Sequence, residues 1–584
     1  MGKAYDARLM RRLWRVARPH RRIILFSVAL FPLVSGLELL QPWLTKIAID
    51  RYILKGEWPG LARVAAAYLL CLLGLYGLRA AVSYLTQLAG QRLMHDLRAA
   101  LFAHLQRQDA AFYDRNAVGR LMTRVLGDVE AINELFSSGA VAVVGDVLTL
   151  SGIVVLMLAL NWELALVTFA LVPVLAVGAA YFRLKARDSY RGVRTRLARL
   201  NAFLQESLQG MPIIQLFARE RREAELFGEL NDDLRRAQFR STLFDSFLYA
   251  GVEALGSAAV ALLLWYGGGQ VLAGALTFGG LVAFLEYLGR FFLPIRDLGA
   301  KYTILQAATV SAERVFGLMD TEPAVRSPAG GGVDFTPEAP ALEFRHVWFA
   351  YAGDEWVLRD CSFVVAPGER VALVGPTGEG KSTIVRLMTR AYDVTRGQVL
   401  VGGRDVREWD LESLRRAVGV IPQEVFLFTG TVGENLRMSG GATPSREVID
   451  RALATARADR VVATLPRGLD EEIHERGQNL SQGQRQLLAI ARALIYNPAI
   501  LALDEATSSV DPESEALIRA GLEELVRGRT SVAIAHRLST IQTADRILVL
   551  HRGHVREAGR HAELLAAGGF YARLYELQFG GGQP

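Results

Sequence analysis

Two hydropathy patterns divide the chain. Residues 23–300 contain six nearly uncharged apolar segments long enough to cross the roughly 30 Å hydrocarbon core of a membrane. Residues 341–584 instead show short apolar strands and amphipathic helices, as in a soluble α/β domain. The predicted spans lie at 23–45, 61–85, 137–160, 163–183, 246–267 and 275–297. These patterns exclude intrinsic disorder, a small disulfide scaffold and a purely soluble enzyme.

The segments outside the spans complete the domain plan. Residues 5–18 have helical periodicity with arginines on one face, which predicts an interfacial helix rather than a cleavable signal peptide. Residues 316–341 are rich in Pro and Gly without periodicity, which is typical of a linker. The predicted parts are an amphipathic cytoplasmic helix (1–22), a six-helix transmembrane domain (23–315), a linker (316–340) and an α/β domain (341–584).

The two long connections between spans, 86–136 and 184–245, are basic, whereas the tight links around Asn161-Trp162 and Gly267-Gly268-Gly269 contain no Lys or Arg. By the positive-inside rule, both long connections and both termini are expected on the cytoplasmic side of the cell membrane. Most of each connection reads as continuous helix, and a 25-residue helical arm would reach roughly 35 Å beyond the membrane. Such arms could transmit motion to a cytoplasmic partner or be helical loops without a mechanical role.

Several ionisable residues fall inside the predicted spans, where charges are costly and usually face an internal cavity. Those that are candidates to face such a cavity are Glu38, Asp146, Glu253, Glu286 and Arg290. Glu286 and Arg290 are spaced i,i+4, which predicts a mutual salt bridge. Glu253 has no such helical partner and is the better cavity candidate. A structural role and contact with cargo both remain open for each of them.

Composition changes this picture little. The formal charge is 66 − 60 = +6, and most of the basic surplus flanks the apolar segments. It therefore indicates membrane orientation and no nucleic-acid partner. The two cysteines, Cys71 and Cys361, cannot form a disulfide framework or a zinc site.

The strongest chemical motif follows a short β-branched run at 370–374 and precedes a helical pattern. It reads G-x-x-x-x-G-K-[ST] and consists of Gly375, Pro376, Thr377, Gly378, Glu379, Gly380, Lys381, Ser382 and Thr383. In this strand–loop–helix context, backbone N–H groups and the helix N-terminus can cradle phosphates. We expect Lys381 to reach the β- and γ-phosphates and Ser382 to bind Mg²⁺.

A second apolar strand, 500–503, ends in Asp504 and Glu505. Beside a phosphate loop, two acids at a strand end are suited to Mg²⁺ and an attacking water. Asp504 is expected to orient the metal shell and Glu505 to polarise or deprotonate the water.

These motifs and the six spans resemble an ABC transporter, specifically the exporter-type (type IV, multidrug-like) half-transporter with one membrane domain fused to one nucleotide-binding domain. The resemblance covers essentially the whole chain. Its most specific residues are Leu480-Ser481-Gln482-Gly483-Gln484-Arg485-Gln486, which match the family signature L-S-G-G-Q-R-Q with one change. The resemblance implies an α-helical membrane domain with long cytoplasmic extensions and an α/β P-loop ATPase domain.

The resemblance also implies roles for single residues. Tyr351 would stack on adenine, Gln423 would be the Q-loop glutamine near Mg²⁺, Asp511 the D-loop aspartate and His536 the switch histidine at the γ-phosphate. Two half-transporters, as a homodimer or heterodimer, would enclose two ATP molecules between the Lys381 loop of one and Ser481–Gly483 of the other, with Gln484 also at the nucleotide. Segments 116–124 and 209–214 resemble coupling helices.

Three positions depart from the family pattern: Gln482 for Gly, Ser509-Val510 for Ala-Leu, and Glu379 where small residues are usual. If the Glu379 side chain points at phosphate, nucleotide affinity should suffer; if it points to solvent, the cost is small. Glu505 and His536 are both present, so the pattern predicts a hydrolysing site.

The sequence thus predicts ATP-driven export of a hydrophobic or amphipathic compound, or of a lipid, by alternating access. Two alternatives share every ATP motif: an importer on the exporter fold, and a membrane-tethered ATPase that gates or senses without pumping. Cargo movement and its direction would distinguish them.

Overall fold

The computed structural model describes residues 7–328, 341–438, 444–504, 511–535 and 538–579. The chain forms two compact units that are not contiguous in sequence. The first comprises residues 1–105 and 119–321, and the second comprises residues 106–118 and 322–584.

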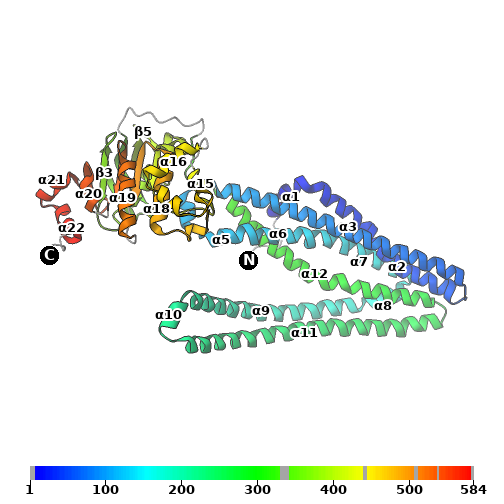
Figure 1. Ribbon diagram of the computed structural model, residues 1–584. Coiled ribbons are helices and arrows are strands. Elements are labelled where there is room, and N and C mark those ends of the chain that lie inside the picture. The colour runs from blue at the N-terminus through cyan, green and yellow to red at the C-terminus, as the bar shows by residue number, and fades with distance from the viewer. Residues whose placement is uncertain (1–6, 329–340, 439–443, 505–510, 536–537, 580–584) are drawn as a thin grey trace. The chain divides into compact units, whose positions relative to one another are not determined.

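The first unit is entirely helical in the described residues, and its longest helices far exceed a membrane thickness (Figure 1). Its helices are α1 Ala7–Ala17, α2 Arg21–Ile47, α3 Trp58–Leu105, α5 Val118–Thr123, α6 Val129–Glu134, α7 Ala140–Leu160, α8 Trp162–Phe169, α9 Leu171–Gln209, α10 Met211–Leu216, α11 Glu220–Leu272 and α12 Phe278–Met319. Helices α9 and α11 run side by side, and α10 joins them at one end (Figure 1). Helix α12 continues four residues into the segment that the sequence assigned to a linker.

Four helical stretches among the described residues are long and apolar enough to cross a membrane: Arg8–Ile53, Trp58–Leu105, Val118–Leu160 and Glu220–Leu272. They contain the first, second, third and fifth predicted spans. The fourth and sixth predicted spans fall in α8–α9 and α12 and stay predictions.

The second unit is an α/β domain built on two main sheets. The larger sheet has the strand order β12-β11-β3-β10-β9-β6, in which only β12 is antiparallel to its neighbour. Its strands are β3 Arg370–Val374, β6 Val418–Ile421, β9 Ile500–Asp504, β10 Thr530–Ile534, β11 Arg546–His551 and β12 His554–Gly559. Five parallel strands with Val, Ile and Leu on both faces are typical of a sheet buried between helices.

The smaller sheet is antiparallel and has the order β2-β1-β4-β5. Its strands are β1 Leu342–Ala350, β2 Trp356–Val365, β4 Arg396–Val401 and β5 Arg404–Asp405, and a separate two-stranded ribbon pairs β7 Gly430–Thr431 with β8 Glu472–Ile473. The helices of this unit are α4 Ala110–Arg115, α13 Lys381–Met388, α14 Leu411–Ala417, α15 Val432–Leu436, α16 Arg446–Thr455, α17 Asp459–Thr464, α18 Gln482–Tyr496, α19 Pro512–Val526, α20 Leu538–Thr543, α21 His561–Ala566 and α22 Phe570–Phe579.

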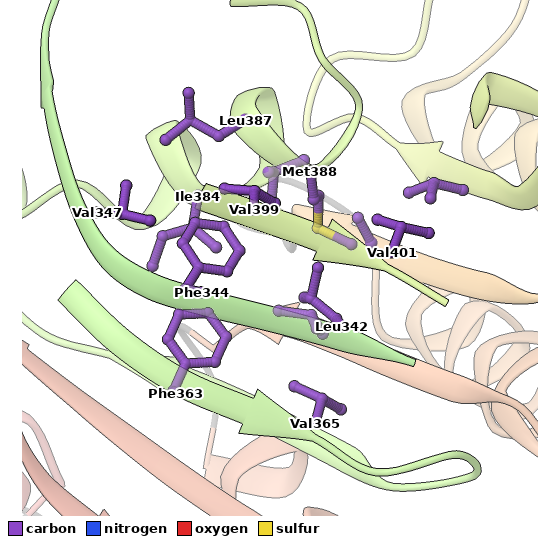
Figure 2. Packing of buried hydrophobic residues seen from close by; sticks show 14 of the residues in the cluster. Leu342, Phe344, Val347, Phe363, Val365, Ile384, Leu387, Met388, Val399 and Val401 are labelled. Carbon is purple, nitrogen blue, oxygen red and sulfur yellow. The ribbon is translucent and has the colours of Figure 1, made fainter. Parts of the chain in front are cut away.

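Helix α13 is anchored by the apolar core between the sheets (Figure 2). Ile384, Leu387 and Met388 of this helix are fully buried, and Ile384 and Met388 point toward side chains of β1 and β4. In the same core Phe344 and Phe363 stack with ring centroids 4.5 Å apart. Burying each such side chain stabilises the fold by about 1.5–3 kcal/mol, so the helix that begins at Lys381 is held firmly in place.

Candidate functional site: a phosphate loop and its surroundings

The phosphate loop joins β3 to α13, as the motif predicted. Gly378 and Gly380 have φ of 90° and 94°, a conformation that favours glycine. A Cβ at Gly380 would come within 2.7 Å of a Leu358 side-chain carbon, and one at Gly375 within 2.5 Å of the Leu550 carbonyl oxygen. The loop therefore passes too close to β2 and β11 for larger residues at these positions.

Lys381 lies in the first turn of α13 and is 7% exposed. Its ammonium group donates hydrogen bonds to the carbonyl oxygens of Gly375 (2.6 Å) and Pro376 (2.7 Å), so it spans the loop. Burial lowers the pKa of Lys381, while the acids Glu379 and Asp504 act in the opposite direction. The neighbouring Ser382 is exposed, and Thr383 is buried.

The Glu379 side chain is anchored to protein rather than extended into solvent. Its carboxylate accepts a hydrogen bond from the Arg552 backbone N–H and lies 3.5 Å from His551 Nδ1. Arg552 and Gly553 form the tight turn between β11 and β12, with φ of 51° and 81°. The unusual acid of the phosphate loop thus has a specific structural partner.

Two predicted site residues and the phosphate loop lie at the carboxyl ends of neighbouring parallel strands. Asp504 ends β9 and is paired in register with Ile534 of β10, and Ile534 in turn neighbours Leu373 of β3. Gln423 follows β6, whose Ile421 pairs with Leu503 of β9. Because carboxyl ends of parallel strands share one edge, Asp504, Gln423 and the phosphate loop gather there, which is where open α/β sheets bind ligands.

The family signature forms the start of α18. Ser481 is the N-cap: its hydroxyl accepts from the Gln484 N–H (3.2 Å), while the Gln484 side chain accepts from the Ser481 N–H (2.9 Å). Ser481 and Gln482 are exposed, and Gly483 is buried. The replacement of Gly by Gln482 therefore places an exposed side chain on the first turn and leaves the capping box intact.

Two further predicted residues have clear local structures. Asp511 caps α19 by accepting a hydrogen bond from the Ser514 N–H (2.8 Å), and this bond holds the Asp511 pKa below its usual value. Tyr351 follows β1, and its hydroxyl shares a hydrogen bond with the Thr383 hydroxyl (3.0 Å). Tyr351 is thereby tied to the phosphate-loop helix. The predicted catalytic residues Glu505 and His536 lie outside the described residues.

The structure adds residues that the sequence did not single out. Residues 106–118, which lie within the first long connection, belong to the second unit, and α4 is capped by Asp109, whose carboxylate also accepts from the Ala324 N–H (2.5 Å). Asp114, at the end of α4, accepts a hydrogen bond from the Tyr392 hydroxyl. The sequence predicted a coupling helix at 116–124, whereas the segment of this connection that belongs to the second unit is 106–118; the coupling role stays a prediction. No sequence signal joins Asp114 to Tyr392, because 278 residues separate them.

Two of the ionisable residues of the predicted spans, Glu38 and Arg290, belong to one polar cluster within the first unit. Glu38 of α2 accepts from Arg79 Nε (3.1 Å) and from Thr149 (3.3 Å). Arg290 donates to the Glu38 carbonyl oxygen and to the Gln41 side chain (2.6 Å). The predicted Glu286–Arg290 bridge is not among the ion pairs of the described residues, because the Arg290 guanidinium turns toward α2. Asp146 pairs with Lys301, and Glu253 is exposed on α11.

The fold and site define a class of protein: a helical membrane unit joined to a phosphate-loop ATPase unit in one chain. Two protein families match it, the ABC transporter transmembrane region over residues 24–295 and the ABC transporter ATPase over residues 358–508. The chain belongs to the ABC transporter family. It is an exporter-type half-transporter that binds and hydrolyses ATP.

The relatives agree with this assignment over nearly the whole chain. An ATP-dependent lipid A-core flippase of Syntrophus aciditrophicus is 35% identical over 98% of this chain and 94% of its own length. A probable multidrug resistance ABC transporter ATP-binding/permease protein of Bacillus subtilis is 37% identical over 85% of this chain and 74% of its own. The solved structure of a bacterial Atm1-family ABC exporter with ATP bound matches with a TM-score of 0.77 and 30% identity, covering 96% of this chain and 98% of that one. The chain is therefore a membrane protein that couples ATP to export.

Proposed function

We propose that this chain, paired with a second half-transporter, exports a hydrophobic or amphipathic compound or a lipid across the bacterial cell membrane by alternating access. The observation that best supports this proposal is the geometry of α18. Ser481 begins α18 at an exposed helix N-terminus, and the N–H groups of such a first turn can bind the phosphates of a nucleotide. One chain has one phosphate loop and one signature, and two chains complete two sites.

Each predicted residue has a role in this site. Lys381 neutralises the phosphates, Tyr351 stacks on adenine, and Ser481 with Gly483 contacts the nucleotide of the partner. Glu505 polarises the attacking water, His536 contacts the γ-phosphate, and Asp511 belongs to the interface between the two ATPase units. Both termini and the ATPase unit face the cytoplasm.

Mg²⁺ fits the donor set near the loop. Ser382, Gln423 and Asp504 offer a hydroxyl, an amide and a carboxylate oxygen, the hard ligands that Mg²⁺ prefers alongside phosphate oxygens. Within the residues that the structure describes, no group of three or more His, Cys, Asp or Glu could hold a metal ion by itself. A nucleotide-bound ion is therefore the form that suits this site, and it would neutralise charge on the phosphates.

The lipid or drug class of cargo is supported by the relatives, whose names describe a lipid A-core flippase and a multidrug transporter. Long apolar helices with few charges are compatible with such cargo. The alternatives of import and of sensing without transport make different predictions for flux.

The test is Mg-dependent ATPase activity of the chain alone in lipid, measured beside Glu505→Gln. We expect activity that the variant loses by at least about 100-fold, in line with the loss of a general base. Inverted vesicles should then accumulate a fluorescent lipid or amphipathic dye only with ATP. Activity that survives in Glu505→Gln would overturn the assignment of Glu505. ATPase activity without flux would favour the sensing alternative, and efflux from inverted vesicles would favour import.

A further inference from the structure

An aromatic cluster beside the phosphate loop connects Tyr351 to residues 106–118. Tyr392 packs edge-on against Tyr351, with ring centroids 5.1 Å apart and an interplanar angle of 87°. Phe349 contacts both rings at 4.8 and 5.6 Å. Edge-to-face pairs at these distances fix ring orientation, so the Tyr351 ring is held by two aromatic neighbours.

The other end of Tyr392 reaches the segment that belongs to the ATPase unit but comes from the first long connection. Its hydroxyl donates to the Asp114 carboxylate at the end of α4. Burial, followed by this carboxylate, raises the pKa of Tyr392 to about 12, so the hydroxyl stays a donor at neutral pH. The Tyr392 side chain therefore contacts Tyr351 through its ring and Asp114 through its hydroxyl.

Arg386 provides a second connection between the same two partners. Its guanidinium carbon lies 5.7 Å from the Tyr351 ring centroid, and its Nη1 lies 3.4 Å from Asp114 Oδ2. Arg386 and Asp114 are about half exposed, so their ion pair alone contributes little. The shielded Tyr392 contact, 8% exposed, is the stronger of the two connections.

Segment 106–118 is itself fixed on this unit. Ala110 and Ala111 pack against the core that holds α13, and Phe112 is buried. Because Tyr351 is also bonded to Thr383 of α13, the nucleotide-side ring and the segment share one packed cluster. A displacement of the Tyr351 ring can therefore reach Asp114 through the contacts of Tyr392.

We propose that Tyr392 is a positioning residue that connects the adenine-facing ring of Tyr351 to Asp114, so that segment 106–118 responds to the base of the bound nucleotide. This inference rests on the proposed role of Tyr351 as the adenine-stacking residue. In this proposal the phosphates bind the loop and the start of α13, whereas the base contacts the aromatic cluster of Phe349, Tyr351 and Tyr392.

The experiment compares two probes on the full chain in lipid: a non-hydrolysable ATP analogue with Mg²⁺, and inorganic tripolyphosphate, which lacks a base. Hydrogen exchange is measured in residues 106–118 at saturating probe. We expect the analogue to slow exchange about fivefold more than tripolyphosphate, the scale of one net hydrogen bond. In Tyr392→Phe and Asp114→Asn this difference should fall below about twofold, and the double variant should equal each single one because all three lose the same bond.

The matched control is Tyr571→Phe. Tyr571 is also a buried tyrosine of this unit with a pKa raised to about 12, and its hydroxyl bonds His561 Nδ1 at 2.6 Å, away from the cluster. The control should keep the difference between probes, and an equal loss there would show a merely structural effect. The inference fails if Tyr392→Phe keeps the full difference. If Tyr351→Ala binds the ATP analogue as tightly as the native chain, the role of Tyr351 fails instead.

Discussion

Glu379 places a negative charge in a loop that must hold phosphates, and its side chain removes the conflict by binding elsewhere. The carboxylate accepts the Arg552 N–H in the β11–β12 turn, and Gly375 at the start of the loop packs against Leu550 of the same strand. The phosphate loop is thus held to β11 at both ends. The Glu379 carboxylate therefore stabilises the loop through the β11–β12 turn and is directed away from the phosphates.

We therefore predict that Glu379→Ala lowers the free energy of unfolding by about 1 kcal/mol, the net contribution of the hydrogen bond that the Arg552 N–H donates to this carboxylate. The KM for ATP should change less than about threefold. Thermal unfolding and steady-state ATPase kinetics check both values, with the exposed Glu355→Ala as control. A tenfold fall in KM without loss of stability would mean that Glu379 faces the phosphates after all.

At the scale of elements, α15 and α18 offer a natural comparison because both begin with a capping box. Thr431 and Glu434 form the box of α15, as Ser481 and Gln484 do for α18. Only the second is proposed to contact nucleotide. We predict that Thr431→Gly and Ser481→Gly each cost a few tenths of a kcal/mol in stability, because glycine is a tolerable N-cap.

ATPase activity should separate the two variants: Ser481→Gly should lose at least about tenfold, while Thr431→Gly should stay within twofold, since a charge-assisted phosphate contact exceeds the cap in strength. Comparable activity in both variants would remove Ser481 from the proposed site. Thermal unfolding measured on the same samples confirms that the helices remain intact.

Elements also show what the sequence could and could not predict. The phosphate loop, the strand ending in Asp504 and the start of α18 were predictable because each is a local pattern whose chemistry depends on its neighbours in the chain. The position of α4 and the partner of Arg290 were not, because each is fixed by contacts across 200 residues or more. The i,i+4 rule suggested Glu286 for Arg290, but packing of α12 on α2 offered a carbonyl and an amide oxygen instead.

At the scale of the whole molecule, two unpaired features suggest how two copies meet. Helix α10 exposes Ile213 (58%) and Leu216 (78%) at the end of the α9–α11 pair. The second unit has a cavity of about 720 Å³ lined by Phe426, Phe428 and Met438 among others. Because residues 209–214 resemble a coupling helix, we expect α10 of one copy to enter this cavity in the other.

Cysteine cross-linking can test this arrangement directly, because the native Cys71 and Cys361 are both buried. Ile213→Cys with Met438→Cys and a bismaleimide about 10 Å long should give a covalent dimer of twice the 64.1 kDa chain. Replacing Met438→Cys by Leu577→Cys, at an exposed site on α22, should not. Thiol loss without a dimer band would indicate a link within one chain and contradict the exchange of α10.

Residues 106–118 belong to the ATPase unit although they lie far from the rest of that unit in the sequence. The chain crosses between its units three times, near 105, 118 and 321, so the ATPase is not a removable C-terminal half. A truncation that begins at residue 322 would uncover the surface on which Ala110, Ala111 and Phe112 pack. A recombination event that replaced only the 3′ half of the gene would likewise join an unmatched α4 to a foreign surface. Substitutions at Asp114 and Tyr392 should therefore covary among related sequences, although the two positions lie in opposite halves of the gene.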